Sequence, residues 1–311
     1  MGPAELIQAV TIARQYFLEG KTKTEIAAEF GLSRYKVARL IDACLAEGIV
    51  RIEISVPSAV DSELSERLRR TFKLNHAVVV TSAASDVVSL RRDLGEAAAA
   101  LLTEIITDDD VLGVSWGRTL DAMARSLKTL APCKIIQMTG VTGPVEANSV
   151  DLIRRLAAVS HGSAYPIYAP LIVSDAATAR ALHHQPGITA ATSQFGSITK
   201  AAVAIGSWDP DGSQLYPVLQ PDDLALVADA NAEAEVCSIL LTGDGVPIDT
   251  EINERTLAIT TEQLRRIPEV VGVAGGESKA RAIYSVIRGG LANSLVTDEN
   301  AALRLLEFAT R

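Results

Sequence analysis

The stretch from Thr22 to Ile54 constrains the fold more than any other part of the chain, because it contains the start and stop signals of two consecutive helices. Thr22 followed three residues later by Glu25 forms a capping box, which is a typical helix start. Gly31 is a suitable stop for that helix, and Ser33 is a suitable N-cap for the next one. The sequence therefore predicts two short helices joined by a tight turn.

The predicted second helix has an apolar face and a basic face. We expect the apolar face to be buried because its residues recur at helical spacing; they are Val37, Leu40, Ile41, Cys44 and Leu45. The other face carries Arg34, Tyr35, Lys36 and Arg39, with no acid between Ser33 and Ile41. Such a face is typical of a recognition helix on DNA, although an ordinary helical hairpin with a solvated basic face is the alternative. The candidate DNA-binding residues are Thr24, Ser33, Arg34, Tyr35, Lys36 and Arg39.

Flanking segments complete a helix-turn-helix head. An apolar helix from about Leu6 to Leu18 supplies a third helix, and Ile49 to Ile54 alternates like a wing strand. The net charge of −9 lies entirely outside the head, since residues 1–56 contain seven Lys or Arg and seven Asp or Glu. The segment VPSAVDS then breaks the pattern with a proline and small polar residues. We therefore expect a DNA-binding domain over residues 1–56 and a second domain over residues 57–311.

In the second domain, short apolar runs alternate with helical patterns. The expected strands are Ala77–Thr81, Val111–Ser115, Lys134–Thr139, Ala201–Ile205, Val236–Leu241, Val270–Ala274 and Leu295–Thr297. The expected helices are Asp61–Phe72, Leu90–Ile106, Leu120–Leu130, Ser149–Ala158, Thr261–Ile267 and Lys279–Arg288. Apolar strands separated by helices indicate a mostly parallel sheet covered on both faces. The predicted fold class is α/β and Rossmann-like.

Ligands of such sheets bind at the carboxyl ends of the strands, where a glycine-rich loop follows the strand at Val111. The strand passes through Gly113 and runs through Ser115–Thr119 into a helix. Backbone N–H groups at a helix start attract an anion, and the side chains of Ser115, Arg118 and Thr119 could add donors.

A second loop of this kind contains Gly275 and Gly276, and it leads to Lys279. Lys279 is predicted to lie in the first turn of a helix, where the helix dipole disfavours a cation unless an anion is close by. A strand, glycine and helix in succession are also ordinary architecture, so each loop is a candidate anion site and not a fingerprint.

The chain resembles the SorC/DeoR-type family of bacterial transcriptional regulators, which join an N-terminal helix-turn-helix to a sugar-binding domain related to sugar-phosphate isomerases. The resemblance covers nearly the whole chain and is carried by YFLEGKTKTEIAAEFGLSRYKVARLI, GVSWGRTL and GVAGGESKARAIYSVIRGGLANSLVTDENAALRLL. It implies an all-α head, a sugar-isomerase-type effector domain and control of a carbohydrate catabolic operon. It also implies homodimers or homotetramers that bind operator DNA.

The same resemblance implies that the effector is a phosphorylated sugar. Its phosphate would be bound by Ser115–Thr119 and Lys279, and its hydroxyls by Glu235, with Glu233 as the alternative. The segment Gln137–Gly140 offers Thr139 and no lysine, so a covalent Schiff base with a sugar aldehyde is not expected. The candidate effector-binding residues are Gly113, Ser115, Trp116, Gly117, Arg118, Thr119, Glu235, Gly275, Gly276 and Lys279.

Residue spacing argues against several other classes of protein. The cysteines Cys44, Cys133 and Cys237 lie far apart, and the histidines lack metal-ligand spacing, so we expect no disulfide, metal or cofactor. The chain has neither a signal peptide nor a long apolar run, which favours a cytoplasmic protein without a membrane partner. A sugar-phosphate isomerase with Glu235 as its base is the alternative function. Because a DNA-reading head has no evident use on such an enzyme, we expect no catalytic residues.

Overall fold

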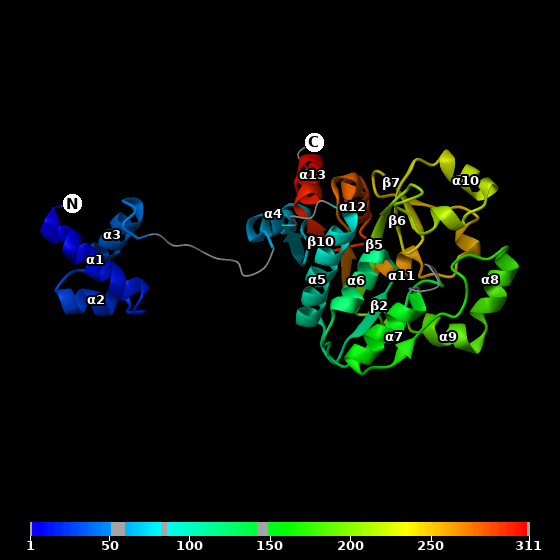
Figure 1. Ribbon diagram of the computed structural model, residues 1–311, viewed down its shortest axis with the longest axis horizontal. Helices are drawn as coiled ribbons and strands as arrows, with labels where there is room; N and C mark the ends of the chain where they lie inside the picture. The colour runs from blue at the N-terminus through cyan, green and yellow to red at the C-terminus, as the bar shows by residue number, and fades with distance from the viewer. Residues whose placement is uncertain (1, 51–59, 82–85, 142–148, 310–311) are drawn as a thin grey trace. The chain divides into compact units, whose positions relative to one another are not determined.

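The structure is a computed structural model that describes residues 2–50, 60–81, 86–141 and 149–309. The chain divides into two compact units, Met1–Pro57 and Ser58–Arg311, which are called the head and the body below. Figure 1 shows a head made of helices and a body with a central sheet.

The head contains the helices α1 (Pro3–Phe17), α2 (Lys23–Phe30) and α3 (Arg34–Ala46). Thr22 and Glu25 form the predicted capping box, because the backbone N–H of each donates to the side chain of the other. Gly31 ends α2 in the left-handed conformation, with φ of 61°. Ser33 Oγ accepts the backbone N–H of Lys36 at 3.1 Å and so caps α3. The predicted start and end of α2 and the predicted start of α3 are therefore confirmed, whereas α1 runs over Pro3–Phe17 and begins earlier than the predicted Leu6.

The three helices enclose a small core of their own. Its buried side chains include Ile12, Ile26, Val37 and Ile41. Leu45 was predicted to be buried but is 39% exposed, because it lies about 80° round the helix from Val37 and at the edge of the apolar stripe. The predicted wing strand over residues 49–54 falls mostly outside the described residues.

The body is built on a mostly parallel sheet with the strand order β1-β10-β9-β5-β2-β3-β4. In that order the strands are Ala77–Val80, Ser294–Asp298, Glu269–Val273, Lys200–Ser207, Val111–Val114, Lys134–Gln137 and Ala164–Tyr165. Neighbours along this path pair in parallel, as the apolar runs predicted.

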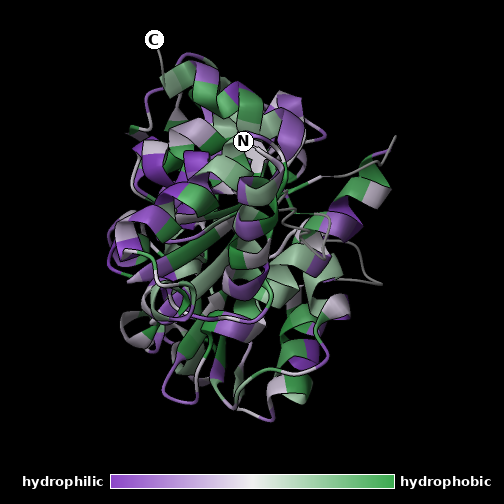
Figure 2. Cartoon of the chain, turned by 90° about the vertical axis from the view of Figure 1, so that its left-hand side faces the viewer, coloured by the Kyte–Doolittle hydropathy of each residue, from purple (hydrophilic) through white to green (hydrophobic). Residues whose placement is uncertain are grey.

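Helices cover both faces of this sheet because parallel strands need crossover connections. One face is covered by α5 (Val87–Ile105), α6 (Arg118–Ser126) and α7 (Ser149–Ser160), and the other by α4 (Ser62–Phe72), α12 (Ala280–Arg288) and α13 (Glu299–Ala309). In β5, Ala202 packs in the core under α5, α6 and α7, and its neighbour Val203 packs in the core under α4, α12 and α13, since side chains alternate along a strand. Figure 2 shows the resulting hydrophobic strands in the interior.

The stretch Val236–Leu241 forms a β-hairpin, so the prediction of a single strand was wrong. Strands β6 (Ala232–Val236) and β7 (Ile239–Thr242) pair antiparallel. Cys237 and Ser238 make the turn, with φ of 51° and 68°. A turn without Gly, Asn or Asp, placed between apolar residues, looks like a continuous strand in the sequence. The hairpin extends from β5, and β8 (Pro247–Ile248) pairs with β7.

The other predicted elements have the correct type but different ends. The helix predicted over Leu120–Leu130 starts at Arg118 and ends at Ser126, and the one predicted to start at Lys279 starts at Ala280. The sequence did not predict α8 (Ala176–His183), α9 (Pro186–Thr192), α10 (Pro221–Ala228) or α13, whereas α11 (Thr261–Arg265) was expected. Helix α10 and the hairpin share a separate small core.

Candidate effector site

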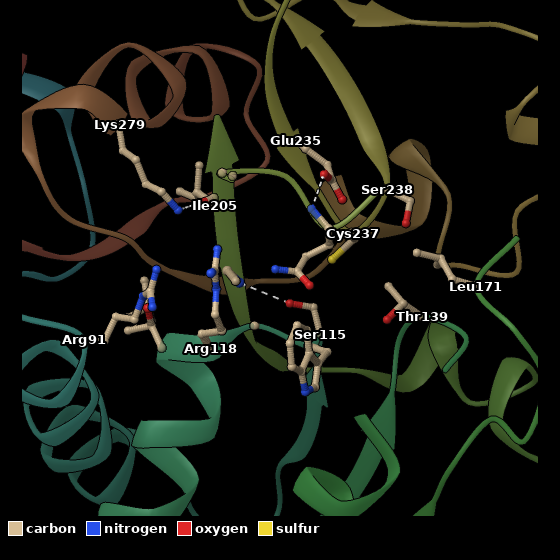
Figure 3. Close-up of a pocket in the computed structure, with 18 residues that line it drawn as sticks. Arg91, Ser115, Arg118, Thr139, Leu171, Ile205, Glu235, Cys237, Ser238 and Lys279 are labelled. Atoms are coloured by element: carbon tan, nitrogen blue, oxygen red, sulfur yellow. Dashed lines mark hydrogen bonds between the residues drawn. The ribbon is translucent and has the colours of Figure 1, made fainter. Parts of the chain in front are cut away.

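A pocket lies at the carboxyl ends of the neighbouring strands β9, β5, β2 and β3 (Figure 3). The predicted site residues that line it are Ser115, Trp116, Gly117, Arg118, Thr119, Glu235 and Lys279. The fold thus brings together three segments that are far apart in the sequence. Glu235 lines the pocket and is buried, whereas the alternative Glu233 is not among the lining residues.

The loop from Ser115 to Thr119 is fixed on β5. Ser115 Oγ accepts the backbone N–H of Ala204 at 3.1 Å, and the backbone N–H of Ser115 donates to the Ala202 carbonyl at 3.1 Å. At Gly117 an added Cβ would lie 2.4 Å from the Ala204 Cβ, so the close approach of the loop to the strand requires glycine. Helix α6 therefore begins at Arg118, at the wall of the pocket.

Cationic side chains from different elements converge on one side of the pocket: Arg91 from α5, Arg118 from α6 and Lys279 (Figure 3). Burial, together with the charges of Arg118 and Arg91, lowers the pKa of Lys279 to about 8. Burial and the charge of Arg118 also lower the pKa of Arg91. The cations therefore repel one another, and an anion between them would relieve that repulsion.

The sequence predicted Lys279 in the first turn of an α-helix, and this prediction was wrong. Lys279 is the last residue of a 3-10 turn, Glu277–Lys279, and it is the N-cap residue of α12. Its Nζ donates to the Ile205 carbonyl at the end of β5, at 3.1 Å. The Nζ atom is therefore fixed at the end of β5 on the cationic side of the pocket, and the surroundings of Lys279 rather than its helix position make it a candidate anion ligand.

Glu235 lies on the other side of the pocket, on β6, and is only 4% exposed. Its Oε2 accepts hydrogen bonds from Ser213 Oγ and from the backbone N–H groups of Gln214 (2.9 Å) and Leu215 (3.1 Å). Burial raises the pKa of Glu235, and these hydrogen bonds and the charge of Lys279 oppose the rise. All of the bonds use Oε2, so Oε1 takes no part in them.

The side chain of Thr139 adds a polar group on the same side as Glu235 (Figure 3). It is 3% exposed, and its Oγ1 has no hydrogen-bond partner among the residues that the structure describes. A buried hydroxyl without a partner is costly, so a group from a ligand would stabilise it. Cys237 also lines the pocket, and burial raises the pKa of its thiol to about 12, which keeps it protonated.

Arg91 is the site residue that sequence reasoning missed. It lies within an amphipathic helix and follows no glycine-rich loop, so no local signal distinguishes it from a surface arginine. Thr139 was noted only for the absence of a lysine at that place, and its position after β3 was the available signal.

Some predicted residues do not line the pocket, namely Gly113, Gly275 and Gly276. At Gly113 an added Cβ would lie 2.7 Å from Met138 Sδ, and at Gly275 it would lie 2.7 Å from Asp298 Oδ1, so both positions need glycine for packing. The backbone N–H of Gly276 donates to Asp298 Oδ1 at 2.6 Å and is not directed to a ligand. The Gly-Gly pair shapes the turn that delivers Lys279.

In the head, the candidate DNA-binding residues come from α2, from the N-cap of α3 and from α3 itself. Thr24, Ser33, Arg34, Tyr35, Lys36 and Arg39 are all exposed. Tyr35 is 76% exposed, a large value for an aromatic side chain, while Val37 on the opposite face is fully buried. Ser33 already uses its hydroxyl to cap α3.

Within the described residues, no group of three or more His, Cys, Asp or Glu side chains is arranged to hold a metal ion. None of the helices that the structure describes combines the length and apolar character needed to cross a membrane.

The chain is similar to known proteins in sequence over most of its length, and in fold. A family model described as "Putative sugar-binding domain" matches residues 57–307. The chain is 29% identical over 303 residues to the "Uncharacterized transcriptional regulator YjhU" of Escherichia coli (strain K12), which covers 94% of this chain and 92% of that protein. It is 28% identical over 303 residues to the "Transcriptional regulator LsrR" of Klebsiella pneumoniae, with coverages of 96% and 92%. The crystal structure of the full-length sorbitol operon regulator SorC from Klebsiella pneumoniae has the same fold, with a TM-score of 0.74, 24% identity and coverages of 97% and 99%.

Proposed function

Because the chain belongs to the SorC/DeoR-type family of sugar-binding transcriptional regulators, we propose that it controls a carbohydrate catabolic operon in response to a phosphorylated sugar. The body, a sugar-isomerase-type Rossmann-like domain in this proposal, binds the effector non-covalently and forms homodimers or homotetramers. The head binds operator DNA. The relatives are named as regulators, which supports a regulatory and not a catalytic role.

The convergence of Arg91, Arg118 and Lys279 in one pocket is the observation that carries the phosphate assignment. A phosphate monoester has a charge between −1.5 and −2 at pH 7 and accepts several hydrogen bonds. It would neutralise side chains that otherwise repel one another. Ser115 and Thr119 lie in the same loop and supply hydroxyl donors.

The opposite side of the pocket suits sugar hydroxyls. Glu235 Oε1 is an acceptor, and Thr139 Oγ1 is a buried hydroxyl without a partner among the described residues. Ser238 and Gln214 add further polar groups. A ligand with a phosphate at one end and hydroxyls at the other matches the two sides.

The exposed basic face of α3 supports the DNA-binding role of the head. Arg34 and Tyr35 lie at the N-terminal end of α3, the part of a recognition helix that contacts base edges. Lys36 lies in the same first turn of α3 and Arg39 about 1.4 turns along, and both would contact phosphates. We propose that the fold of α2 and α3 is a helix-turn-helix, and that two heads read the half-sites of a palindromic operator.

A thermal-shift screen of phosphorylated sugars against the same sugars without phosphate tests this function. At one hundred times its dissociation constant, the effector should add about 2.7 kcal/mol to the free energy of unfolding. Lys279→Ala should weaken binding of that effector by about tenfold to a hundredfold, because a hydrogen bond to a charged group contributes about 1.5 to 3 kcal/mol. Equal binding of a sugar with and without its phosphate would refute the proposal.

A further inference from the structure

The segment from Trp208 to Tyr216 contacts both sides of the pocket. It follows β5, and it returns to β6 through the backbone hydrogen bond from Trp208 to Glu233 at 3.1 Å. Its residues Gly212 and Gln214 line the pocket. The ends of the segment touch each other, because the rings of Trp208 and Tyr216 lie 5.1 Å apart.

On the cationic side, the segment supplies the acceptors that an anion would otherwise provide. Arg118 Nη2 donates a hydrogen bond to the Asp211 carbonyl. Burial raises the pKa of the Asp209 carboxylate, but hydrogen bonds from Ser207, Gly212 and Asp211 outweigh burial and lower it. The charge of Lys279 adds to this lowering, so the two charges attract each other. Asp209 Oδ1 also accepts the backbone N–H groups of Asp211 (3.0 Å) and Gly212 (2.7 Å), so it fixes the turn that presents the Asp211 carbonyl.

On the other side, the segment takes up one oxygen of Glu235. Ser213 Oγ and the backbone N–H groups of Gln214 and Leu215 all donate to Glu235 Oε2. Ser213 Oγ in turn accepts the backbone N–H of Tyr216 at 2.8 Å, so this hydroxyl joins the segment to the carboxylate. Arg118 and Glu235, both assigned to the effector above, are thus held by the same nine residues.

The space left in the pocket agrees with this arrangement. The cavity volume is about 40 Å³, which admits roughly three water molecules and is far too small for a sugar phosphate. A ligand of that size therefore has to displace part of the lining. The part held by polar contacts alone is the turn from Asp209 to Gln214, since Leu215 is fully buried in the small core next to the hairpin.

We propose that the turn Asp209–Gln214 of this segment occupies the anion site when no effector is bound, and that an anion on Arg118 displaces this turn, so that its position reports occupancy. This inference rests on the function proposed above and concerns the regulation of that site. The displacement is a competition for the same donors, so the affinity for the anion is reduced by the free energy of the contacts between the segment and the pocket. Loosening the segment should then strengthen anion binding.

Ser213→Ala tests the competition with no change of charge. Ser213 anchors the Glu235 end and, among the residues that the structure describes, its hydroxyl donates no hydrogen bond to a group on the cationic side, so we expect its effect on anion binding to pass through the segment. With inorganic phosphate as the probe and the full chain as the sample, isothermal titration should give a three- to tenfold lower Kd for Ser213→Ala than for the parent. Ser160→Ala is the matched control, because it removes another buried serine hydroxyl, at the end of α7, that does not line the pocket. This variant should leave the Kd unchanged.

Hydrogen exchange of the parent protein provides a second measurement that needs no variant. Saturating phosphate, compared with chloride at equal ionic strength, should speed exchange of the backbone amides of Gly212, Gln214 and Leu215 severalfold. An unchanged or slower exchange, or an unchanged or higher Kd for Ser213→Ala, would overturn the competition. If Lys279→Ala still weakens phosphate binding in that case, the phosphate site stands and only the role of the segment is wrong. Absence of phosphate binding to the parent would overturn both.

Discussion

If Lys279 binds the phosphate as proposed, its charge should set the pH range over which the pocket binds an anion. Burial and the neighbouring Arg118 and Arg91 lower the pKa of Lys279 to about 8, so its positive charge is present below that pH and is lost as the pH rises through it. Phosphate monoesters have their second pKa near 6, so they are already dianions at the pH values around and above 8 at which Lys279 loses its charge. We expect the affinity for the sugar phosphate to fall by about tenfold per pH unit above pH 8, as measured by isothermal titration. In Lys279→Arg the fall should disappear, because a guanidinium stays charged.

Asp110 has a separate, structural role at the other end of β2. Burial raises its pKa, but hydrogen bonds from Lys200 (2.5 Å), Thr199 and Thr107 outweigh that effect and hold the pKa at about 2. Because the pKa is lower in the folded state, the ionised carboxylate stabilises the fold above about pH 4, and this contribution is lost as the pH falls towards 2.

Asp110→Asn should therefore lower the free energy of unfolding at pH 7 by about 2 kcal/mol and flatten its decline between pH 4 and pH 2. Urea unfolding at several pH values measures both effects. Asp121→Asn is the control, since Asp121 pairs with the exposed Arg125 on a helix surface and should change stability by less than about 0.5 kcal/mol. A parallel pH dependence in the parent and in Asp110→Asn would contradict the assignment.

How well a site residue could be predicted depends on whether its signal is local. Ser115–Thr119 and Lys279 follow glycine-rich turns at strand ends, and such turns are visible in the sequence. Arg91 reaches the pocket from within α5 and belongs to neither glycine-rich loop, so only the packing of α5 on the sheet reveals it. Glu235 was identified through the family resemblance. Its hydrogen-bond donors come from the turn that contains Ser213 and Gln214, and no periodicity in the sequence indicates that turn.

At the scale of single elements, α3 gives a test that separates base contacts from phosphate contacts. Arg34→Ala should reduce discrimination at one operator position by roughly 1 to 3 kcal/mol. Lys36→Ala should weaken all sequences about equally and reduce the salt slope by about 1. Fluorescence anisotropy with operator variants at several salt concentrations measures both. Arg154→Ala, an exposed arginine on α7 of the body, should have neither effect; unchanged affinity in both head variants would show that the recognition face lies elsewhere.

The hairpin turn at Cys237 and Ser238 stores backbone strain, since both residues have positive φ without being glycine. Ser238→Gly should raise the free energy of unfolding by about 1 kcal/mol, because glycine adopts this conformation at little cost. The same change within α12, Ser285→Gly, should lower it, because there the backbone is helical. Chemical denaturation of the two variants should thus give opposite signs, and a destabilised Ser238→Gly would show that the hydroxyl matters more than the strain.

At the scale of the whole molecule, the central sheet could be predicted and its periphery could not. Strand β2 is apolar throughout, and β9 is apolar from Val270 onward, because both faces of the sheet are covered, and this pattern is typical of the parallel sheet of an α/β chain. Helices α8, α9 and α10 are seven or eight residues long, which leaves little room for a helical period, and α2, of the same length as α8 and α10, was predicted from its capping box and its glycine stop. The hairpin failed for a related reason, since two short apolar strands without a turn residue between them match the pattern of one strand.

The division into head and body predicts that the two activities can be separated. Ile26 and Ile41 pack in a core made of head residues, whereas Leu112 and Ile136 belong to the cores of the body, and each cluster is complete within its own unit. A unit with its own core is expected to fold alone. Residues 57–311, expressed without the head, should therefore unfold cooperatively and bind the sugar phosphate with an unchanged Kd in calorimetry, while operator binding is lost. An unfolded product, or one with at least tenfold weaker effector binding, would mean that the head contributes to the effector site.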